Sequence, residues 1–174
     1  CLNLRMEHSR ISLAGADGPI LSMMGFSTVG GMSGPLVAHT SGTVLCFASS
    51  LAEMLQMVNL FGVTGLWLAV GQLEPFFNIL GDQPPPKSLS YLGLGGSKIT
   101  RTMLMEARAR ICSKVLLGYG STEMSWISLA PTSTTDMDEG FAGHVFPWVD
   151  LEVVDQEDRP LPPGQDGTIR VRTP

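Results

Sequence analysis

The sequence predicts an α/β fold, with a mostly parallel sheet covered by helices on both faces, followed by the start of an antiparallel β element. Short, continuously apolar runs alternate with segments of helical periodicity up to about residue 132, which is typical of a parallel sheet buried on both faces. Beyond that point, two strand-like runs are separated only by a polar, proline-rich turn. We therefore expect an α/β subdomain over residues 1–132 and a β-rich segment, beginning the next subdomain, over residues 133–174.

Five apolar runs are expected to form the strands of the first part. In chain order they cover residues 19–24, 42–48, 63–70, 89–94 and 114–117. The helix after the second run begins with Ser50-Leu-Ala-Glu53. This is a capping box, in which Ser50 accepts a hydrogen bond from the amide of Glu53 and Glu53 reaches back to Ser50. Gly62 is expected to end this helix as its C-cap.

Two further helices and two further strands complete the prediction. Helices are expected over residues 73–80 and 101–111, and the triple proline at residues 84–86 is a stiff spacer before the fourth strand. Strands are expected over residues 149–155 and 167–172. Ligands of parallel sheets bind beyond the carboxyl ends of the strands. The glycine-rich segments that follow the fourth and fifth strands are therefore candidate binding elements.

Composition limits the classes of partner and the cellular location. The 174 residues carry a net charge of −5 with 16% charged side chains and no basic run, so nucleic acid is not expected as a partner. The longest apolar stretch, residues 60–80, is interrupted by polar residues and a proline, so no membrane span is expected. The cysteines Cys1, Cys46 and Cys112 lack metal-ligand spacing, and no signal peptide is visible. These features predict a cytoplasmic protein with reduced thiols.

The segment Gly118-Tyr-Gly-Ser-Thr-Glu123 combines groups suited to a magnesium nucleotide. Its two glycines let the backbone turn sharply, and Tyr119 between them offers a flat face on which a base can stack. Thr122 offers a hydroxyl to a phosphate oxygen, and Glu123 offers an oxygen ligand to magnesium. Each residue alone also has an ordinary explanation, because a tyrosine after a strand is commonly a rim residue and a Ser-Thr-Glu run commonly caps a helix.

A second glycine-rich segment, Gly93-Leu-Gly-Gly-Ser97, ends the fourth expected strand. Such a turn can cradle a phosphate or let an adenine lie against bare backbone. The segment lacks the spacing of a dinucleotide fingerprint and the Lys-Ser/Thr end of a P-loop. A tight turn is therefore the simpler explanation when the segment is taken alone.

Taken together, four motifs follow one another in a recognisable order: Gly95-Gly-Ser97, Tyr119-Gly-Ser-Thr-Glu123, Gly140-Phe-Ala-Gly143 and Leu161-Pro-Pro-Gly-Gln-Asp-Gly-Thr-Ile-Arg-Val-Arg172. Their order and gaps resemble those of the AMP-forming acyl-CoA synthetases and of their relatives in the adenylate-forming superfamily, the nonribosomal-peptide adenylation domains and the luciferases. The likeness covers nearly the whole chain. It implies an ATP-dependent ligase that activates a small carboxylic acid as an acyl-adenylate and then forms a thioester with CoA.

The resemblance also implies roles for individual residues. Tyr119 would stack on the adenine of ATP or AMP, Thr122 would bind the α-phosphate, and Glu123 would hold Mg²⁺, so that Thr122 and Glu123 are the expected catalytic residues. The remaining residues implied to bind the nucleotide are Gly95, Gly96, Ser97, Gly120 and Ser121.

The pocket for the carboxylic acid is implied to include Phe26 and Trp67. Phe26 stands where family members often carry a histidine, and an aromatic ring can wall a pocket but cannot donate or accept the hydrogen bonds of an imidazole. Val70 replaces a common proline near Trp67. Ordinary core packing explains both aromatic residues as well.

Other parts that the resemblance implies do not occur in these 174 residues. They are a phosphate-binding loop with its lysine, a ribose-binding aspartate, and the catalytic lysine of a C-terminal domain. We therefore expect an internal fragment that is inactive alone, whose partners are the N-terminal and C-terminal parts of the same enzyme, and which can self-associate. Two alternatives remain: an adenylation domain that loads a carrier protein, and a non-catalytic interaction protein that kept the fold.

Overall fold

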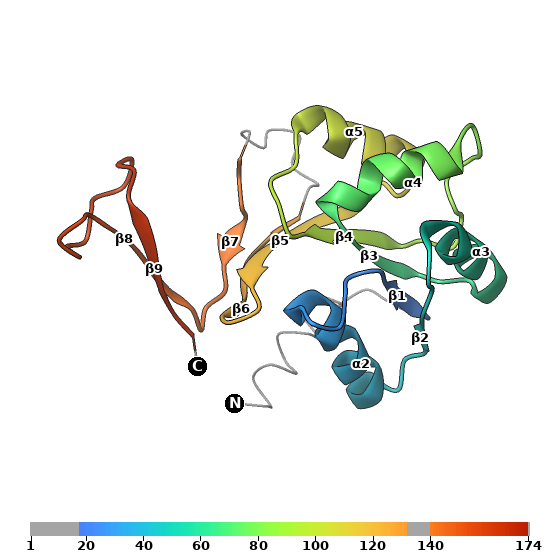
Figure 1. Ribbon diagram of the computed structural model, residues 1–174, viewed down its shortest axis with the longest axis horizontal. Helices are drawn as coiled ribbons and strands as arrows, with labels where there is room; N and C mark the ends of the chain where they lie inside the picture. The colour runs from blue at the N-terminus through green and yellow to red at the C-terminus, as the bar shows by residue number, and fades with distance from the viewer. Residues whose placement is uncertain (1–17, 132–139, 174) are drawn as a thin grey trace.

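The computed structural model describes residues 18–131 and 140–173 (Figure 1). Seven strands form one sheet in the order β2-β1-β3-β4-β5-β6-β7. Their bounds are β1 Ile20–Ser22, β2 Leu45–Cys46, β3 Gly65–Ala69, β4 Tyr91–Gly95, β5 Val115–Ser121, β6 Ser125–Pro131 and β7 His144–Val145. The strands from β2 to β5 pair in parallel, and β6 and β7 are added in antiparallel orientation. The expected parallel sheet is confirmed.

A separate two-stranded antiparallel sheet follows, made of β8 (Asp150–Val154) and β9 (Thr168–Arg172). Both expected late strands are thus confirmed. Two ion pairs join register partners across the exposed face of this sheet, Arg172 with Asp150 and Arg170 with Glu152. The expected boundary at residues 132–133 lies outside the described residues.

Helices cover both faces of the large sheet (Figure 1). Three helices, α3 (Leu51–Phe61), α4 (Leu73–Leu80) and α5 (Arg101–Arg110), lie on one face, and α2 (Val29–Ser41) lies against β1 and β2 on the other. A short 3-10 helix, η1 (Val70–Gln72), leads into α4. In the described part of the chain, no helix has the length and apolar character needed to cross a membrane.

The pleat of the central strands divides the core into two layers. Leu66 and Leu68 of β3 point to the face of α3, α4 and α5, together with their register partners Leu92 and Leu94 of β4. Trp67 lies between Leu66 and Leu68 in sequence and therefore points to the opposite face, where it packs in a second, aromatic-rich cluster. All five side chains are almost fully buried.

Glycines on the second face make room for large rings. A Cβ atom on each of three strand glycines would stand less than 3 Å from an aromatic side chain that covers it. The pairs are Gly65 with Tyr91, Gly93 with Trp67, and Gly118 with Trp126. The rings therefore lie directly on bare strand backbone, which allows a thick aromatic layer to pack close to the sheet.

The start and end of α3 largely follow the sequence signals. Ser50 accepts a hydrogen bond from the amide of Glu53 at 3.2 Å, as expected. The predicted hydrogen-bond donor to Glu53 was wrong. The Glu53 carboxylate accepts a hydrogen bond from the amide of Ser49 at 2.7 Å and not from that of Ser50. Gly62 adopts the left-handed conformation with a φ of 60° and ends the helix as predicted.

Two elements differ from the sequence expectation. Helix α2 was not located, because it contains Pro35 and three glycines that disfavour a helix on propensity alone. The fifth strand does not end at residue 117 but continues to Ser121, where it turns into the antiparallel strand β6. Tyr119 therefore lies within a strand, beside an irregularity in the register at Gly120.

Candidate functional site

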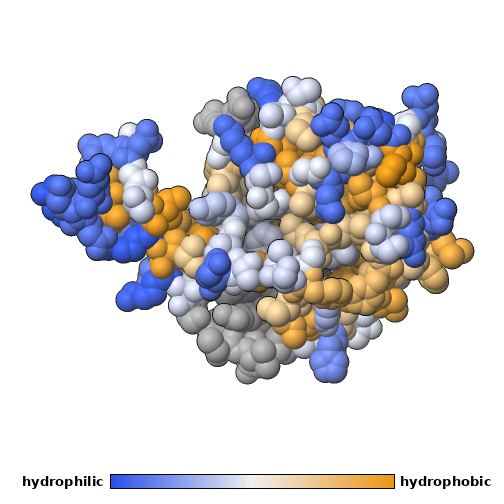
Figure 2. All heavy atoms as spheres, in the orientation of Figure 1, coloured by the Kyte–Doolittle hydropathy of each residue, from blue (hydrophilic) through white to orange (hydrophobic). Residues whose placement is uncertain are grey.

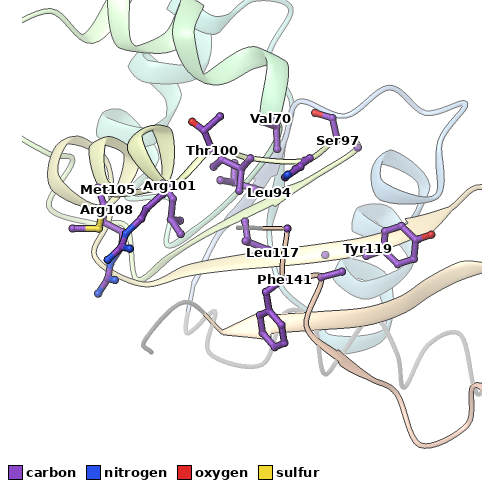
Figure 3. Close-up of a pocket in the computed structure, with 18 residues that line it drawn as sticks. Val70, Leu94, Ser97, Thr100, Arg101, Met105, Arg108, Leu117, Tyr119 and Phe141 are labelled. Carbon is purple, nitrogen blue, oxygen red and sulfur yellow. The ribbon is translucent and has the colours of Figure 1, made fainter. Parts of the chain in front are cut away.

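A cavity of about 450 Å³ lies where the ends of β4 and β5 meet α5 (Figure 3). Its apolar floor is formed by Leu94, Leu104 and Leu117, which come from β4, α5 and β5. Residues 140–142 close one side. The cavity thus lies at the carboxyl edge of the parallel strands, where ligands of such sheets bind.

Four of the expected nucleotide-binding residues line this cavity: Gly96, Ser97, Tyr119 and Gly120. Gly96 has a φ of 87°, a conformation that favours glycine, and it turns the chain from β4 toward α5. Ser97 and Tyr119 lie toward the same end of the cavity, and the Tyr119 side chain is 40% exposed (Figure 3). The fold therefore brings together two segments that are more than twenty residues apart in sequence.

Gly95 does not line the cavity but lies directly behind it. It is buried, and a Cβ atom there would stand 3.3 Å from the carbonyl oxygen of Gly118, from Cε of Met24 and from the ring of Trp126. A side chain at this position would therefore push against β5 and the aromatic layer. Its role in the structure is to let three elements approach closely behind the cavity wall.

The expected phosphate and metal residues lie outside the cavity, in the turn between β5 and β6. Thr122 and Glu123 are both exposed there. The hydroxyl of Ser121 accepts a hydrogen bond from the amide of Met124 at 3.3 Å, which fixes the turn. Hydrogen bonding from Ser121 also lowers the pKa of the Glu123 carboxyl, which favours its ionised form.

Phe26 and Trp67 lie on the other side of β3 and β4 and border two different hollows. Phe26 is 63% exposed beside a second cavity of about 380 Å³, and its ring centroid lies 5.4 Å from that of Phe47. Trp67 is only 6% exposed and packs against Trp126 at a centroid distance of 5.3 Å. The structure therefore does not bring Phe26 and Trp67 into direct contact with the first cavity.

The cavity also contains residues that the sequence did not single out. Arg101 and Arg108 of α5 line its far end, away from Ser97 and Tyr119 (Figure 3). Phe141 adds an aromatic wall. Arg101 and Arg108 are seven residues apart, which places both on one face of the helix. This spacing is the sequence feature that could have indicated them.

Comparisons with known proteins agree with this architecture. The whole sequence, residues 1–174, matches the family described as AMP-binding enzyme. No curated protein matches the sequence significantly. Among solved structures, an O-succinylbenzoate coenzyme A synthetase from Bacillus subtilis in complex with AMP superimposes with a TM-score of 0.85 at 19% identity. That comparison covers 99% of this chain and 36% of the synthetase chain.

A second solved structure has the same fold. The luciferase-like enzyme of the mealworm Zophobas morio gives a TM-score of 0.79 at 23% identity, over 97% of this chain and 42% of that chain. The present chain thus spans well under half of the length of these structural relatives. Because the family match extends over all 174 residues, the chain belongs to the AMP-binding enzyme family.

Proposed function

We propose that this chain supplies the adenine-binding part of an ATP-dependent enzyme that activates carboxylic acids. The observation that carries the proposal is the convergence of Gly96, Ser97, Tyr119 and Gly120 on one cavity. Bare backbone at the glycines admits a flat base, and the Tyr119 ring offers it a stacking surface. The apolar floor excludes water from the face of the base.

The reaction proposed for the whole enzyme has two steps. A carboxylate oxygen attacks the α-phosphorus of ATP, the bond to the β-phosphate oxygen breaks, and pyrophosphate leaves. A thiol sulfur, proposed to be that of CoA, then loses its proton to water and attacks the acyl carbon. The bond from this carbon to the phosphate oxygen breaks, and AMP leaves with the bonding electron pair. Both reactants of the first step are anions, so the charge on the phosphates must be neutralised while the reacting atoms are held in line.

Thr122 and Glu123 are the residues of this chain that we assign to the phosphates and to Mg²⁺. Mg²⁺ in nucleotide sites is commonly held by one or two carboxylates together with phosphate oxygens. In the part of the chain that the structure describes, no group of three or more His, Cys, Asp or Glu side chains is suited to hold a metal ion. A single exposed carboxylate such as Glu123 therefore fits a magnesium ion that arrives with the nucleotide. Its lowered pKa favours the anionic form.

An NMR titration tests the base-binding part of the proposal. We expect AMP to shift the amide resonances of Gly96, Ser97 and Tyr119, and to leave unchanged those of α3, which contributes no residue to the cavity lining. Shifts confined to segments outside the cavity would contradict the assignment.

The metal assignment is tested by the magnesium dependence of ATP affinity. In the unaltered chain Mg²⁺ should strengthen ATP binding, and Glu123→Gln should remove most of this gain while leaving the affinity for AMP unchanged. Glu74→Gln, an exposed glutamate on α4, is the matched control. An equal response to Mg²⁺ in all three proteins would exclude Glu123 as the ligand.

The 174-residue chain on its own is proposed to bind nucleotide without turnover. The resemblance implies a phosphate-loop lysine, a ribose-binding aspartate and a catalytic lysine that these residues do not contain. An enzyme that lacks several of the groups that act together in its transition state retains little activity. A pyrophosphate-release assay with several acids should therefore give only the blank rate, and release that depends on Glu123 would contradict this expectation.

A further inference from the structure

The end of the first cavity that lies away from Tyr119 is lined by one face of α5. Arg101, Met105 and Arg108 follow one another at spacings of four and three residues, which places them on the same face of the helix. Their side chains lie together at this end (Figure 3). Because a helix rises about 1.5 Å per residue, the two arginines are about 10 Å apart along the axis, with Met105 between them. This face therefore offers two cations that flank an apolar surface.

The charge at this end of the cavity is positive, although the protein as a whole carries a net charge of −5. No aspartate or glutamate is among the described residues that line the cavity. The nearby Arg110 is already engaged, because it pairs with Glu106 and donates to two backbone carbonyl oxygens at the end of α4. Among the residues whose positions are described, Arg101 and Arg108 form no ion pair and no hydrogen bond. Both guanidinium groups thus remain available to an anion.

The cavity has room for a second ligand beside a base. Its volume of about 450 Å³ lies within the range of pockets that hold drug-sized molecules. A base that stacks on Tyr119 lies at the opposite end from the arginines (Figure 3). Leu104 and Phe141 also line the cavity and add apolar surface. A ligand at the arginine end can therefore combine an anionic group with a small apolar body.

We propose that the arginine end is a separate subsite for a small organic phosphate, which binds beside the base. Its phosphate accepts hydrogen bonds from Arg101 and Arg108, and its apolar part lies against Met105 and Phe141. A phosphate monoester suits this site because planar guanidinium groups bind phosphate through paired hydrogen bonds. Its charge of about −1.5 to −2 at neutral pH also matches two cations.

This subsite is distinct from the one assigned to the phosphates of the nucleotide. Thr122 and Glu123, which carry that assignment, do not line the cavity, whereas both arginines do. The inference rests on the proposed function only in taking the Tyr119 end as the site of the base. The ligand at the arginine end is an additional one that binds next to the nucleotide and takes no part in the proposed reaction.

Phenyl phosphate is the probe for this subsite, and the Met105 methyl resonance, assigned by its loss in Met105→Leu, is the readout. With AMP at saturation, phenyl phosphate should shift this resonance. Inorganic phosphate should bind roughly tenfold more weakly, because it lacks the apolar contact. Phenol and benzylamine, which lack the anion, should cause no shift at the same concentrations. Added salt should weaken the binding of phenyl phosphate, because Arg101 is exposed and Arg108 only half-buried.

The outcomes with these probes separate the possible ligands. Inorganic phosphate that binds as tightly as phenyl phosphate would exclude an organic ligand. Phenol that binds as tightly would show that the arginines take no part. Displacement of phenyl phosphate by AMP would show that the subsite is not separate. Each of these results overturns the inference and leaves the proposed function standing.

Substitution of the arginines tests their role directly. Arg108→Gln should weaken phenyl phosphate binding roughly tenfold or more, and combining it with Arg101→Gln should remove the binding. Lys87→Gln, which removes an exposed cation outside the cavity, is the matched control and should change nothing. A thermal melt shows that each variant is folded. Phenyl phosphate binding that persists in the double variant overturns the inference.

Titrations with AMP distinguish this inference from the proposed function. Loss of AMP binding in the folded double variant would place the phosphate of AMP at the arginines, and it would overturn both the separate subsite and the assignment of Thr122 and Glu123. An unaltered chain that binds phenyl phosphate but not AMP would overturn the proposed function alone.

Discussion

The indole ring of Trp67 covers the backbone of Gly93, its register partner on the neighbouring strand. A Cβ atom on Gly93 would stand 2.3 Å from Cδ2 of this ring, far inside contact distance. The pairing therefore joins the two strands on the face opposite α3, α4 and α5, and it places a buried indole where the resemblance had implied a substrate pocket.

Gly93→Ala should destabilise the protein by roughly 1–3 kcal/mol, because the added methyl group would overlap the Trp67 ring and force it to shift. Urea unfolding measures the change. Gly71→Ala is the control, since a Cβ atom there would meet nothing within 4 Å. It should leave the free energy of unfolding unchanged or raise it by less than about 1 kcal/mol. Equal effects of the two substitutions would show that the ring is not held against Gly93.

Arg110 connects α5 to the end of α4, and its loss should be costly. Its guanidinium donates to the carbonyl oxygens of Phe77 at 2.9 Å and of Gly81 at 2.7 Å, and it pairs with Glu106 at 2.6 Å. Arg110→Met should lower the free energy of unfolding by roughly 1–3 kcal/mol, because two helix-end carbonyls lose a charged donor. Glu106→Gln removes only a partly exposed ion pair and should cost less than about 1 kcal/mol. If both variants lost the same stability, the ion pair and not the capping contact would be responsible.

Glu53 should make the start of α3 sensitive to acid. Hydrogen bonds from the Ser49 hydroxyl and amide lower the pKa of the Glu53 carboxyl. A group whose pKa is lower in the folded state stabilises the fold above its unfolded pKa, and this contribution is lost as the pH falls through the folded pKa. Glu53→Gln should therefore be less stable than the unaltered protein at pH 7, and the difference should shrink as the pH falls below the ordinary glutamate pKa of about 4.3. A difference that does not vary with pH would contradict this account.

Much of the fold was predictable because local signals and burial agree. The continuous apolar runs of β3 and β4 predicted strands covered on both faces, and the structure buries all residues of β4 and all of β3 except Ala69. Helix α4 occupies the expected residues 73–80, where apolar side chains recur at helical spacing. The Ser50 cap and the Gly62 C-cap set the ends of α3 through short-range hydrogen bonds that a sequence pattern captures.

The elements that were missed depend on contacts between distant residues. Helix α2 tolerates glycine because its backbone approaches the preceding loop: a Cβ atom on Gly31 would stand 2.2 Å from the carbonyl oxygen of Gly25. Strand β5 extends past its glycines because β6 pairs with it, and no local pattern shows that partner. The pairing of Gly118 with the ring of Trp126 likewise requires knowledge of the tertiary fold.

The candidate site was predicted in part. The order of the motifs predicted Gly96, Ser97, Tyr119 and Gly120 as nucleotide-binding residues, and all four line one cavity in the structure. Their chemical roles remain predictions. Arg101 and Arg108 at the far end of the cavity were not predicted, because helical periodicity shows which residues share a face but not what that face borders.

Exposed apolar side chains predict self-association of the 174-residue chain. Hydrophobic residues gather over α2, β2 and α3 on the visible face in Figure 2. At the end of α3, Leu60 is 77% exposed and Phe61 52% exposed. Contiguous apolar surface of this kind commonly marks contact with another protein surface. Light scattering over a dilution series should show a mass that rises with concentration, and the double substitution Leu60→Ser and Phe61→Ser should reduce the rise. A monomer at every concentration would contradict the prediction.

The most direct test of the proposed function is the calorimetric titration of AMP into the unaltered chain and into Tyr119→Ala, with a thermal melt of each protein. Tyr119 is partly exposed at the cavity wall, so its loss should leave the melting temperature nearly unchanged. The affinity for AMP should fall roughly 5- to 150-fold, as expected for one lost stacking face. Phe61→Ala, which lies outside the cavity, should retain full affinity. A Tyr119→Ala protein that melts earlier but binds AMP as tightly as before would show that Tyr119 is a packing residue and would contradict the assignment of the site.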